Sequence, residues 1–225
     1  MNVINYQKEL DKIIEKIQKE GRRPSLLLHS CCAPCSSYCM EYLTQYFDIT
    51  VYYYNPNITD EEEYRLRVEE QQRLIREFPG IKFEEGPYDP ESFFDIAKGL
   101  EMVPEGGERC FRCYELRLKQ AVDAAKLGGY DYVTTTLTIS PLKNSKKLNE
   151  IGERLLQRAD NERCGAVEES VQFVSETRLT WLPSDFKKRN GYKRSVELSA
   201  QYDLYRQNYC GCVYSKEEAE RREGK

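Results

Sequence analysis

The chain has 225 residues, of which 40% are hydrophobic and 32% charged, and its formal net charge is -4. These values predict one large domain or two small ones with a hydrophobic core, and they exclude a globally basic nucleic-acid coat protein. No run of about 20 apolar residues is present to span a membrane. The first 20 residues carry eight charges, which is unlike a secretory signal. We therefore expect a cytoplasmic protein with no membrane partner.

Helices and strands alternate along the first part of the chain. Apolar residues at three- and four-residue spacing predict a helix over residues 2–20, which Gly21 ends. The pattern then predicts a buried strand over 25–28, a helix over 36–46, a β-branched and aromatic strand over 49–54, a helix from Thr59 or Asp60 to Phe78, and a strand over 81–85.

The second part continues the alternation and then loosens. A helix begins at Asp89-Pro-Glu91, and Gly128-Gly129 ends a later helix that starts at Arg109. Residues 157–178 are charged and weakly periodic, so we expect an inserted surface segment there. The remaining predicted elements are a strand over 132–137, a helix over 146–156, a strand over 180–183, a helix over 193–205, and a charged, frayed tail over 216–225.

About five strand–helix alternations predict a single α/β domain over residues 1–215. Its sheet should be parallel, with helices on both faces. Ligands of such sheets bind at the carboxyl ends of the strands. The loop over residues 30–34 directly follows the first predicted strand, so we expect a site at this edge of the sheet.

The chain has nine cysteines and one histidine. An odd number of cysteines without a secretory signal argues against a disulfide framework. Multi-histidine metal sites and the HExxH motif of zinc hydrolases are excluded, because His29 is the sole histidine. Seven cysteines lie in three short clusters: Cys31, Cys32 and Cys35; Cys110 and Cys113; and Cys210 and Cys212.

Thiols clustered on short segments are typical ligands of soft metals, so iron–sulfur clusters and structural zinc are both candidates. The radical-SAM pattern CxxxCxxC is absent because Tyr38 occupies its third position. Three distant segments must therefore fold into one site. Because one cubane cluster takes at most four thiolates, the other three suit a second metal or reactive thiols.

The two remaining cysteines and the histidine are interpreted as structural. Cys39 and Cys164 are predicted to pack as small hydrophobic residues, although Cys39 could also face the site. His29 lies at a predicted strand end, where a packed, hydrogen-bonded role is favoured over metal ligation.

One basic segment stands out on this acidic chain. It holds five cations in eight residues together with one aromatic ring, and we predict that it contacts RNA phosphates while the ring stacks on a base. The alternative is a solvated loop and helix start. The predicted contact residues are Lys187, Lys188, Arg189, Tyr192, Lys193 and Arg194.

Five motifs together resemble the QueH family of epoxyqueuosine reductases, over about residues 25–215. They are Leu28-His-Ser-Cys-Cys-Ala-Pro-Cys-Ser36, Arg109-Cys-Phe-Arg-Cys-Tyr-Glu-Leu-Arg-Leu118, Leu182-Pro-Ser-Asp-Phe-Lys-Lys188, Gly191-Tyr-Lys-Arg-Ser195 and Tyr205-Arg-Gln-Asn-Tyr-Cys-Gly-Cys-Val-Tyr-Ser215. Residues 157–178 make the chain longer than the resemblance leads us to expect between two motifs, and Cys39 and Cys164 fall outside the motifs.

The resemblance implies the last step of queuosine formation in tRNA, in which an epoxide on the modified base is reduced to an alkene. It implies a [4Fe–4S] cluster, a nearby mononuclear iron and no cobalamin. An external electron donor would be needed, and Asp89 and Asp185 are candidate proton donors by motif position alone. The implied fold is similar to the adenine nucleotide α-hydrolase (HUP-type) group, with the cysteine loop in place of that group's SGGxDS pyrophosphate loop.

Two other functions are kept as alternatives. A zinc-stabilised RNA-binding module without catalysis would leave several of the seven thiols unused, because a structural zinc holds four ligands. A tRNA sulfur transferase would require ATP, and both GxGxxG and GxxxxGK[ST] are absent from the sequence.

Overall fold

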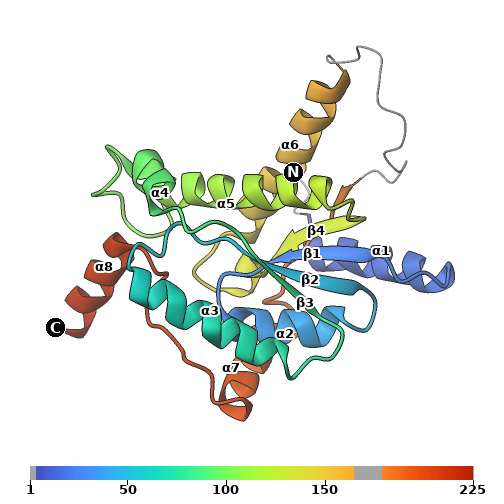
Figure 1. Ribbon diagram of the computed structural model, residues 1–225, viewed down its shortest axis with the longest axis horizontal. Helices are drawn as coiled ribbons and strands as arrows, with labels where there is room; N and C mark the ends of the chain where they lie inside the picture. The colour runs from blue at the N-terminus through green and yellow to red at the C-terminus, as the bar shows by residue number, and fades with distance from the viewer. Residues whose placement is uncertain (1–3, 165–178, 225) are drawn as a thin grey trace.

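The computed structural model describes residues 4–164 and 179–224. Within these residues it confirms the predicted α/β fold, with an all-parallel sheet in the order β3-β2-β1-β4-β5 (Figure 1). The order is compatible with the HUP-type group, which remains an expectation. The strands are β1 (Ser25–His29), β2 (Asp48–Tyr53), β3 (Lys82–Glu85), β4 (Tyr132–Thr135) and β5 (Thr180–Trp181).

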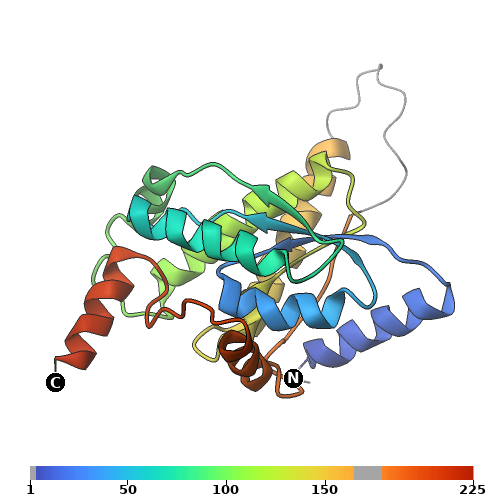
Figure 2. The ribbon, with the colours of Figure 1, turned by 60° about the horizontal axis from the view of Figure 1, so that its bottom comes forward.

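Helices cover both faces of the sheet, as predicted (Figures 1 and 2). The alternation of side chains along β1 shows why, since Leu26 and Leu28 join one buried cluster and Leu27 joins the other. The first cluster includes side chains of α1 (Tyr6–Lys19), α2 (Ala33–Leu43) and α3 (Glu61–Ile75), and the second includes those of α5 (Glu108–Leu127) and α6 (Ser145–Cys164).

The central strand β1 lies between β2 and β4, at the point where the strand order reverses. From β1 the chain builds outward through β2 to β3 and later returns to β4 on the other side of β1. His29 is paired with Thr135, so the carboxyl ends of β1 and β4 lie side by side. This is the switch point at which α/β sheets bind their ligands.

The strand predicted over 132–137 is shorter than expected. It ends at Thr135, and a 3₁₀ helix, η1 (Thr136–Ile139), follows. The Thr135 hydroxyl caps this turn by accepting a hydrogen bond from the Leu137 amide at 3.1 Å. A threonine-rich run therefore continues as a turn rather than a strand, because its side chains bond the backbone locally.

The helix predicted over 146–156 is longer than expected, since α6 continues to Cys164. Leu155 and Leu156 remain buried against α5, and Arg154 forms a 3.0 Å ion pair with Glu115 of that helix. The helix thus extends into the first part of the segment expected to be an insertion, where Arg158 also pairs with Glu115 at 3.8 Å. The rest of that segment, residues 165–178, lies outside the described residues.

The charged tail is helical where fraying was expected. Helix α8 (Val213–Glu223) begins directly after the last cysteine and lies at the same end of the molecule as α4 (Pro90–Ala97) (Figures 1 and 2). Ala219 is buried, and Glu218 reaches the buried Arg109 at 3.4 Å. No helix within the described residues has the length and apolar character needed to cross a bilayer.

Asn149 of α6 ties the helix to the edge of the sheet. Its Oδ1 accepts hydrogen bonds from Trp181 Nε1 and the Ser184 amide, both at 3.0 Å. Its Nδ2 donates to the carbonyls of Ser184 and Ser145, at 2.8 and 2.7 Å. This fully buried amide therefore satisfies four polar groups that would otherwise lack partners.

We predict that Asn149→Ala lowers the free energy of unfolding by about 3 kcal/mol, because it leaves several buried polar groups unpaired. Urea unfolding followed by far-ultraviolet circular dichroism measures the change. Glu150→Ala is the matched control on the exposed face of the same helix, and it should change the free energy by less than about 0.5 kcal/mol. Equal values for the two variants would contradict the assigned role.

Candidate metal centre

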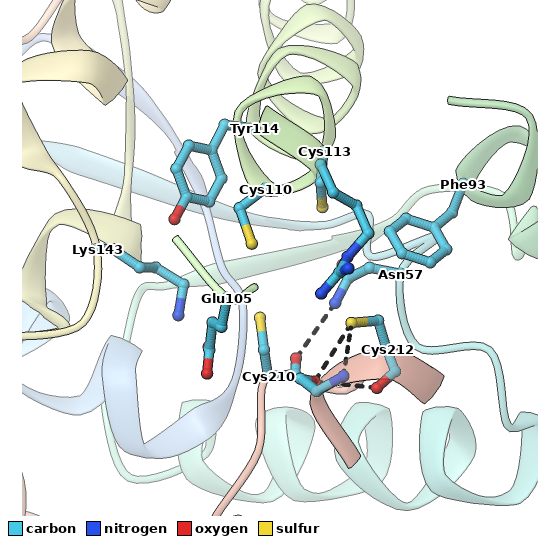
Figure 3. A pocket seen from close by; sticks show the side chains of 11 residues that line it. Asn57, Phe93, Glu105, Cys110, Cys113, Tyr114, Lys143, Cys210 and Cys212 are labelled. Atoms are coloured by element: carbon cyan, nitrogen blue, oxygen red, sulfur yellow. Dashed lines mark hydrogen bonds between the residues drawn. The ribbon is translucent and has the colours of Figure 1, made fainter. Parts of the chain in front are cut away.

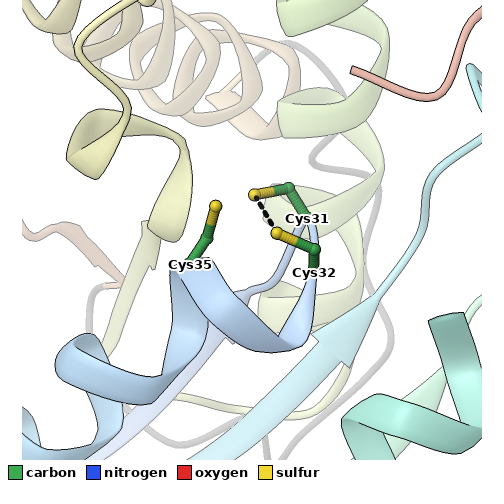
Figure 4. A group of neighbouring side chains, drawn as sticks. All are labelled: Cys31, Cys32 and Cys35. Atoms are coloured by element: carbon green, nitrogen blue, oxygen red, sulfur yellow. Dashed lines mark hydrogen bonds between the residues drawn. The ribbon is translucent and has the colours of Figure 1, made fainter. Parts of the chain in front are cut away.

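The first thiol group lies in the loop between β1 and α2. The Sγ atoms of Cys31, Cys32 and Cys35 all lie within 4.8 Å of one another (Figure 4). Cys32 is the N-cap of α2 with an extended backbone, and Pro34 fixes the first helical turn. The strand end, the cap and the first turn thereby aim three sulfurs at one point, which can hold a metal ion.

Thr136, the first residue of η1, fixes Cys31 from the turn that follows the neighbouring strand β4. Its Oγ1 accepts a hydrogen bond from the Cys31 amide at 3.1 Å and donates one to Cys31 Sγ at 3.3 Å. The adjacent ends of β1 and β4 make this contact available. Sequence reasoning missed Thr136, because its position was assigned to a strand.

Protons are shared unequally in this group. The pKa of Cys31 lies well below its ordinary value, because the Cys32 and Cys35 thiols hydrogen-bond to it. The same contacts raise the pKa of Cys32 to about 12 and that of Cys35 well above its usual range. Cys31 is therefore the first of the three to become a thiolate, the form that binds metals.

The second thiol group lines a pocket beside the first. Cys110 and Cys113, from the first turns of α5, face Cys210 and Cys212, from the segment that leads into α8, and the four sulfurs point into one cavity (Figure 3). The predicted i, i+3 pair does present both thiols on one side of α5. The cavity is also lined by Asn57, Phe93, Glu105, Arg109, Tyr114, Lys143 and Ser215.

Burial favours the protonated form of three of these thiols, those of Cys110, Cys113 and Cys212. It raises the pKa of Cys113 to about 12 and that of Cys212 to about 11. Burial also raises the pKa of Cys110. Metal binding would release these protons, because the thiolate is the ligand.

A strap formed by residues 202–212 carries Cys210 and Cys212 to the pocket along α3. Arg73 of α3 donates to the carbonyls of Tyr202 and Asp203, both at 2.9 Å. Glu70 accepts the Tyr205 amide at 2.7 Å. The strap therefore follows α3 because side chains of α3 form hydrogen bonds with the backbone of the strap.

Two further contacts hold the end of the strap. The buried guanidinium of Arg67, paired with Glu63 at 2.6 Å, lies over the Tyr209 ring. Asn57 Nδ2 donates to the Cys210 carbonyl at 3.2 Å. Sequence reasoning missed both anchors, because neither lies near a cysteine in the chain.

Gly211 between the two cysteines is required by the backbone. Its φ of +112° lies in the region that favours glycine. A Cβ at this position would lie 2.8 Å from Ile58 Cγ1 and 3.2 Å from Arg67 Nη1. The Cys-Gly-Cys spacing therefore allows a tight turn that presses the strap against α3 and turns both thiols toward the pocket.

His29 has a structural role, which the sequence interpretation favoured. It is fully buried, with Nδ1 2.8 Å from the Thr135 hydroxyl and Nε2 3.1 Å from the Tyr54 carbonyl. Burial and the nearby Arg117 cation lower its pKa to about 3. Both ring nitrogens have partners, so neither is directed to a metal.

Neither candidate proton donor lines the thiol pocket. Asp89 caps α4 by accepting the Ser92 amide at 3.2 Å and the Ser92 hydroxyl at 2.5 Å. Asp185 pairs with Lys187 at 2.9 Å. The geometry gives no support to either as a proton donor. Cys39, on α2, is fully buried in the hydrophobic core, consistent with a packing role. Cys164 is the last residue of α6.

The basic segment is largely neutralised within the chain. Lys187, Arg189 and Arg194 pair with Asp185, Asp11 and Glu41, at 2.9, 2.7 and 2.7 Å respectively. Lys188, Tyr192 and Lys193 remain exposed, and neither lysine forms an ion pair with a described residue. Only part of the predicted RNA-contacting set is therefore free to meet a phosphate.

We predict that Gly211→Ala lowers the metal content of the purified protein, because the added Cβ displaces the strap and separates Cys210 and Cys212 from α5. Gly80→Ala is the matched control, since Gly80 also has a positive φ but has open space around its Cβ direction. Metal analysis after anaerobic purification measures the difference. Equal metal content in the two variants would show that the turn is not needed.

Comparisons with known proteins show the family of the chain. The family model described as epoxyqueuosine reductase QueH matches residues 26–218. The chain is 43% identical to epoxyqueuosine reductase QueH of Staphylococcus epidermidis, with 94% of this chain and 84% of the relative covered. For the proteins of the same name from Streptococcus pyogenes and Haemophilus influenzae, identity is 44% and 37%, coverage of this chain 94% and 90%, and coverage of the relative 78% and 76%. This chain belongs to the epoxyqueuosine reductase QueH family.

Proposed function

We propose that this protein reduces epoxyqueuosine in tRNA to queuosine at the edge of the sheet where its thiols meet. The observation that carries the proposal is the convergence of all seven motif cysteines into two neighbouring groups at the β1–β4 switch point. Family membership supplies the reaction. The site provides what a reductive metalloenzyme needs, which is many thiolate donors in a buried place.

The reaction consumes two electrons and two protons for each epoxide, which becomes an alkene and one water. The donor set fits iron, since thiolates are the ligands of iron–sulfur clusters. When bound, a [4Fe–4S] cluster supplies single electrons, and an iron with an open position acts as a Lewis acid. The electrons come from an external donor. The chain's own residues hold the metals, exclude water through burial and set the local charge.

We assign the two thiol groups to different metals. A tetrahedral ion with sulfur ligands at about 2.3 Å requires sulfurs close together, as in Cys31, Cys32 and Cys35. A cubane takes one thiolate at each of four corners and needs a space between them. Cys110, Cys113, Cys210 and Cys212 surround such a space. We therefore propose the mononuclear iron at the first group and the [4Fe–4S] cluster at the second.

The alternatives differ from this proposal in measurable ways. A zinc-stabilised RNA-binding module would contain zinc, lack colour and leave the nucleoside unchanged. A sulfur transferase would add sulfur to the nucleoside. Incubation of the anaerobically purified protein with epoxyqueuosine-containing tRNA and a low-potential reductant, followed by mass spectrometry of the nucleosides, separates the three. Loss of one oxygen supports the proposal, and no conversion by an iron-loaded protein would contradict it.

We predict that substitutions in the two thiol groups remove different metals. Cys32→Ala should lose a single iron while the electron paramagnetic resonance signal of a reduced cluster persists. Cys113→Ala and Cys212→Ala should lose that signal and most of the iron. All three should lose activity, whereas the control Cys164→Ala should keep iron and activity. If the cluster signal were lost in Cys32→Ala and kept in Cys113→Ala and Cys212→Ala, the assignment would be reversed.

We also propose that the exposed part of the basic segment contacts tRNA. Lys188→Glu combined with Lys193→Glu should weaken tRNA binding and reduce the dependence of log K on log salt by about one unit per lysine. Iron content should not change. Lys82→Glu combined with Lys98→Glu makes the same charge change on other exposed positions and serves as the control. Equal binding by both double variants would remove the segment from the RNA interface.

A further inference from the structure

Arg117 is a buried cation that no acidic side chain neutralises. It projects from α5 and is 1% exposed. Among the described residues no carboxylate forms an ion pair with it. Its Nη2 donates a hydrogen bond to Asn55 Oδ1, a neutral acceptor. The Asn55 side chain is fixed in turn, because its Nδ2 donates to the Ser30 carbonyl at 2.9 Å. A buried charge of this kind is costly unless an anion faces it.

The free donors of Arg117 mark where that anion belongs. Its Nε and Nη1 are buried and have no hydrogen-bond partner. The guanidinium instead interacts with the thiols of Cys113, Cys210 and Cys31, which outweigh the effect of burial and raise the pKa of Arg117. These thiols come from both groups. Arg117 therefore interacts with thiols of both groups, and its Nε and Nη1 have N–H groups to offer an anion.

Lys143 repeats this arrangement on the loop between η1 and α6. Its side chain lines the thiol pocket (Figure 3). The thiols of Cys210, Cys31 and Cys35 and the Tyr114 hydroxyl together outweigh burial and raise its pKa. Lys143 thus also faces members of both groups.

The one carboxylate that lines the pocket does not neutralise Lys143. That group, Glu105, pairs instead with Arg222 at 3.9 Å. Among the described residues, neither Arg117 nor Lys143 therefore has an acidic partner, and each interacts with thiols of both groups.

We infer that Arg117 and Lys143 are positioning residues of the metal centre, whose charges balance the negative charge of the metal-bound thiolates and make the centre easier to reduce. The inference rests on the proposed function, because it takes the thiols to hold iron. Metal-bound thiolates supply the anions that the two cations lack, and the free N–H groups of Arg117 can hydrogen-bond to sulfur. Positive charge and hydrogen bonds near cluster sulfurs raise the reduction potential.

The test compares the reduction potential in charge-removing and charge-keeping variants. Arg117→Gln and Lys143→Gln should each shift the midpoint potential of the cluster to more negative values, measured by redox titration with electron paramagnetic resonance detection. Arg117→Lys should recover part of the shift. Arg112→Gln and Lys146→Gln are the matched controls, since both side chains are exposed and neither lines the pocket. The controls should leave the potential unchanged.

Metal retention gives a second readout that does not depend on activity. Iron loss to a chelator should be about 10- to 100-fold greater in the two glutamine variants, the range found for residues that support metal ligands. In the metal-free protein, Arg117→Gln should not lower the thermal midpoint of unfolding, because it removes an unneutralised buried charge. A purely structural arginine would instead lower that midpoint with or without metal.

The outcomes are distinguishable from failure of the proposed function. A protein that holds only zinc would overturn the reductase proposal and with it the reduction-potential claim. Iron-loaded Lys143→Gln and Arg117→Gln with unchanged potential and unchanged iron retention would overturn the inference and leave the reductase proposal standing. If Arg117→Gln does not fold, Lys143→Gln, which alters a half-buried loop residue, decides the question.

Discussion

The parallel pairing of β1 with β4 is the interaction on which the site depends. It places His29 beside Thr135, so the cysteine loop that follows β1 and the turn that follows β4 must share one edge. Thr136 then holds Cys31 through both its amide and its sulfur. The loop after η1 brings Lys143 to the same edge. A chain with the same cysteines but another strand order would not assemble this centre.

The second requirement is a route for the C-terminal cysteines. Cys210 and Cys212 follow no strand, so the sheet alone does not position them. The strap reaches the pocket through contacts of its backbone with Arg73, Glu70 and Asn57. The strap also makes a side-chain contact, since the Arg67 guanidinium lies over the Tyr209 ring, and the tight turn at Gly211 completes its path to the pocket. The strap therefore links the stability of α3 to the geometry of the metal site.

Electrostatics explains why so many thiols can share one buried place. Thiolates repel one another in a low-dielectric interior, and burial alone raises their pKa. Arg117 and Lys143 each interact with thiols of both groups, and their positive charge opposes that repulsion. The three ion pairs of the basic segment show the opposite arrangement, since their cations are already neutralised by acids of the same chain. The cations near the thiols and those of the basic segment therefore differ in whether an acidic side chain lies beside them, and not in the number of lysines and arginines.

The sequence by itself determined the α/β class, the order of most elements and the clustering of seven cysteines on three short segments, because periodicity and local spacing are properties of neighbours in the chain. It also indicated a structural role for His29. It did not reveal the full length of α6 or the helix over Val213–Glu223, because packing partners far away in the sequence stabilise them. It also missed the turn at Thr136, which the Thr135 hydroxyl caps locally. The division of seven thiols into three and four was decided only by the tertiary structure. The proposed roles of Arg117 and Lys143 also rest on the tertiary structure, since a buried cation without an acidic partner is recognised only in space and no local pattern records it.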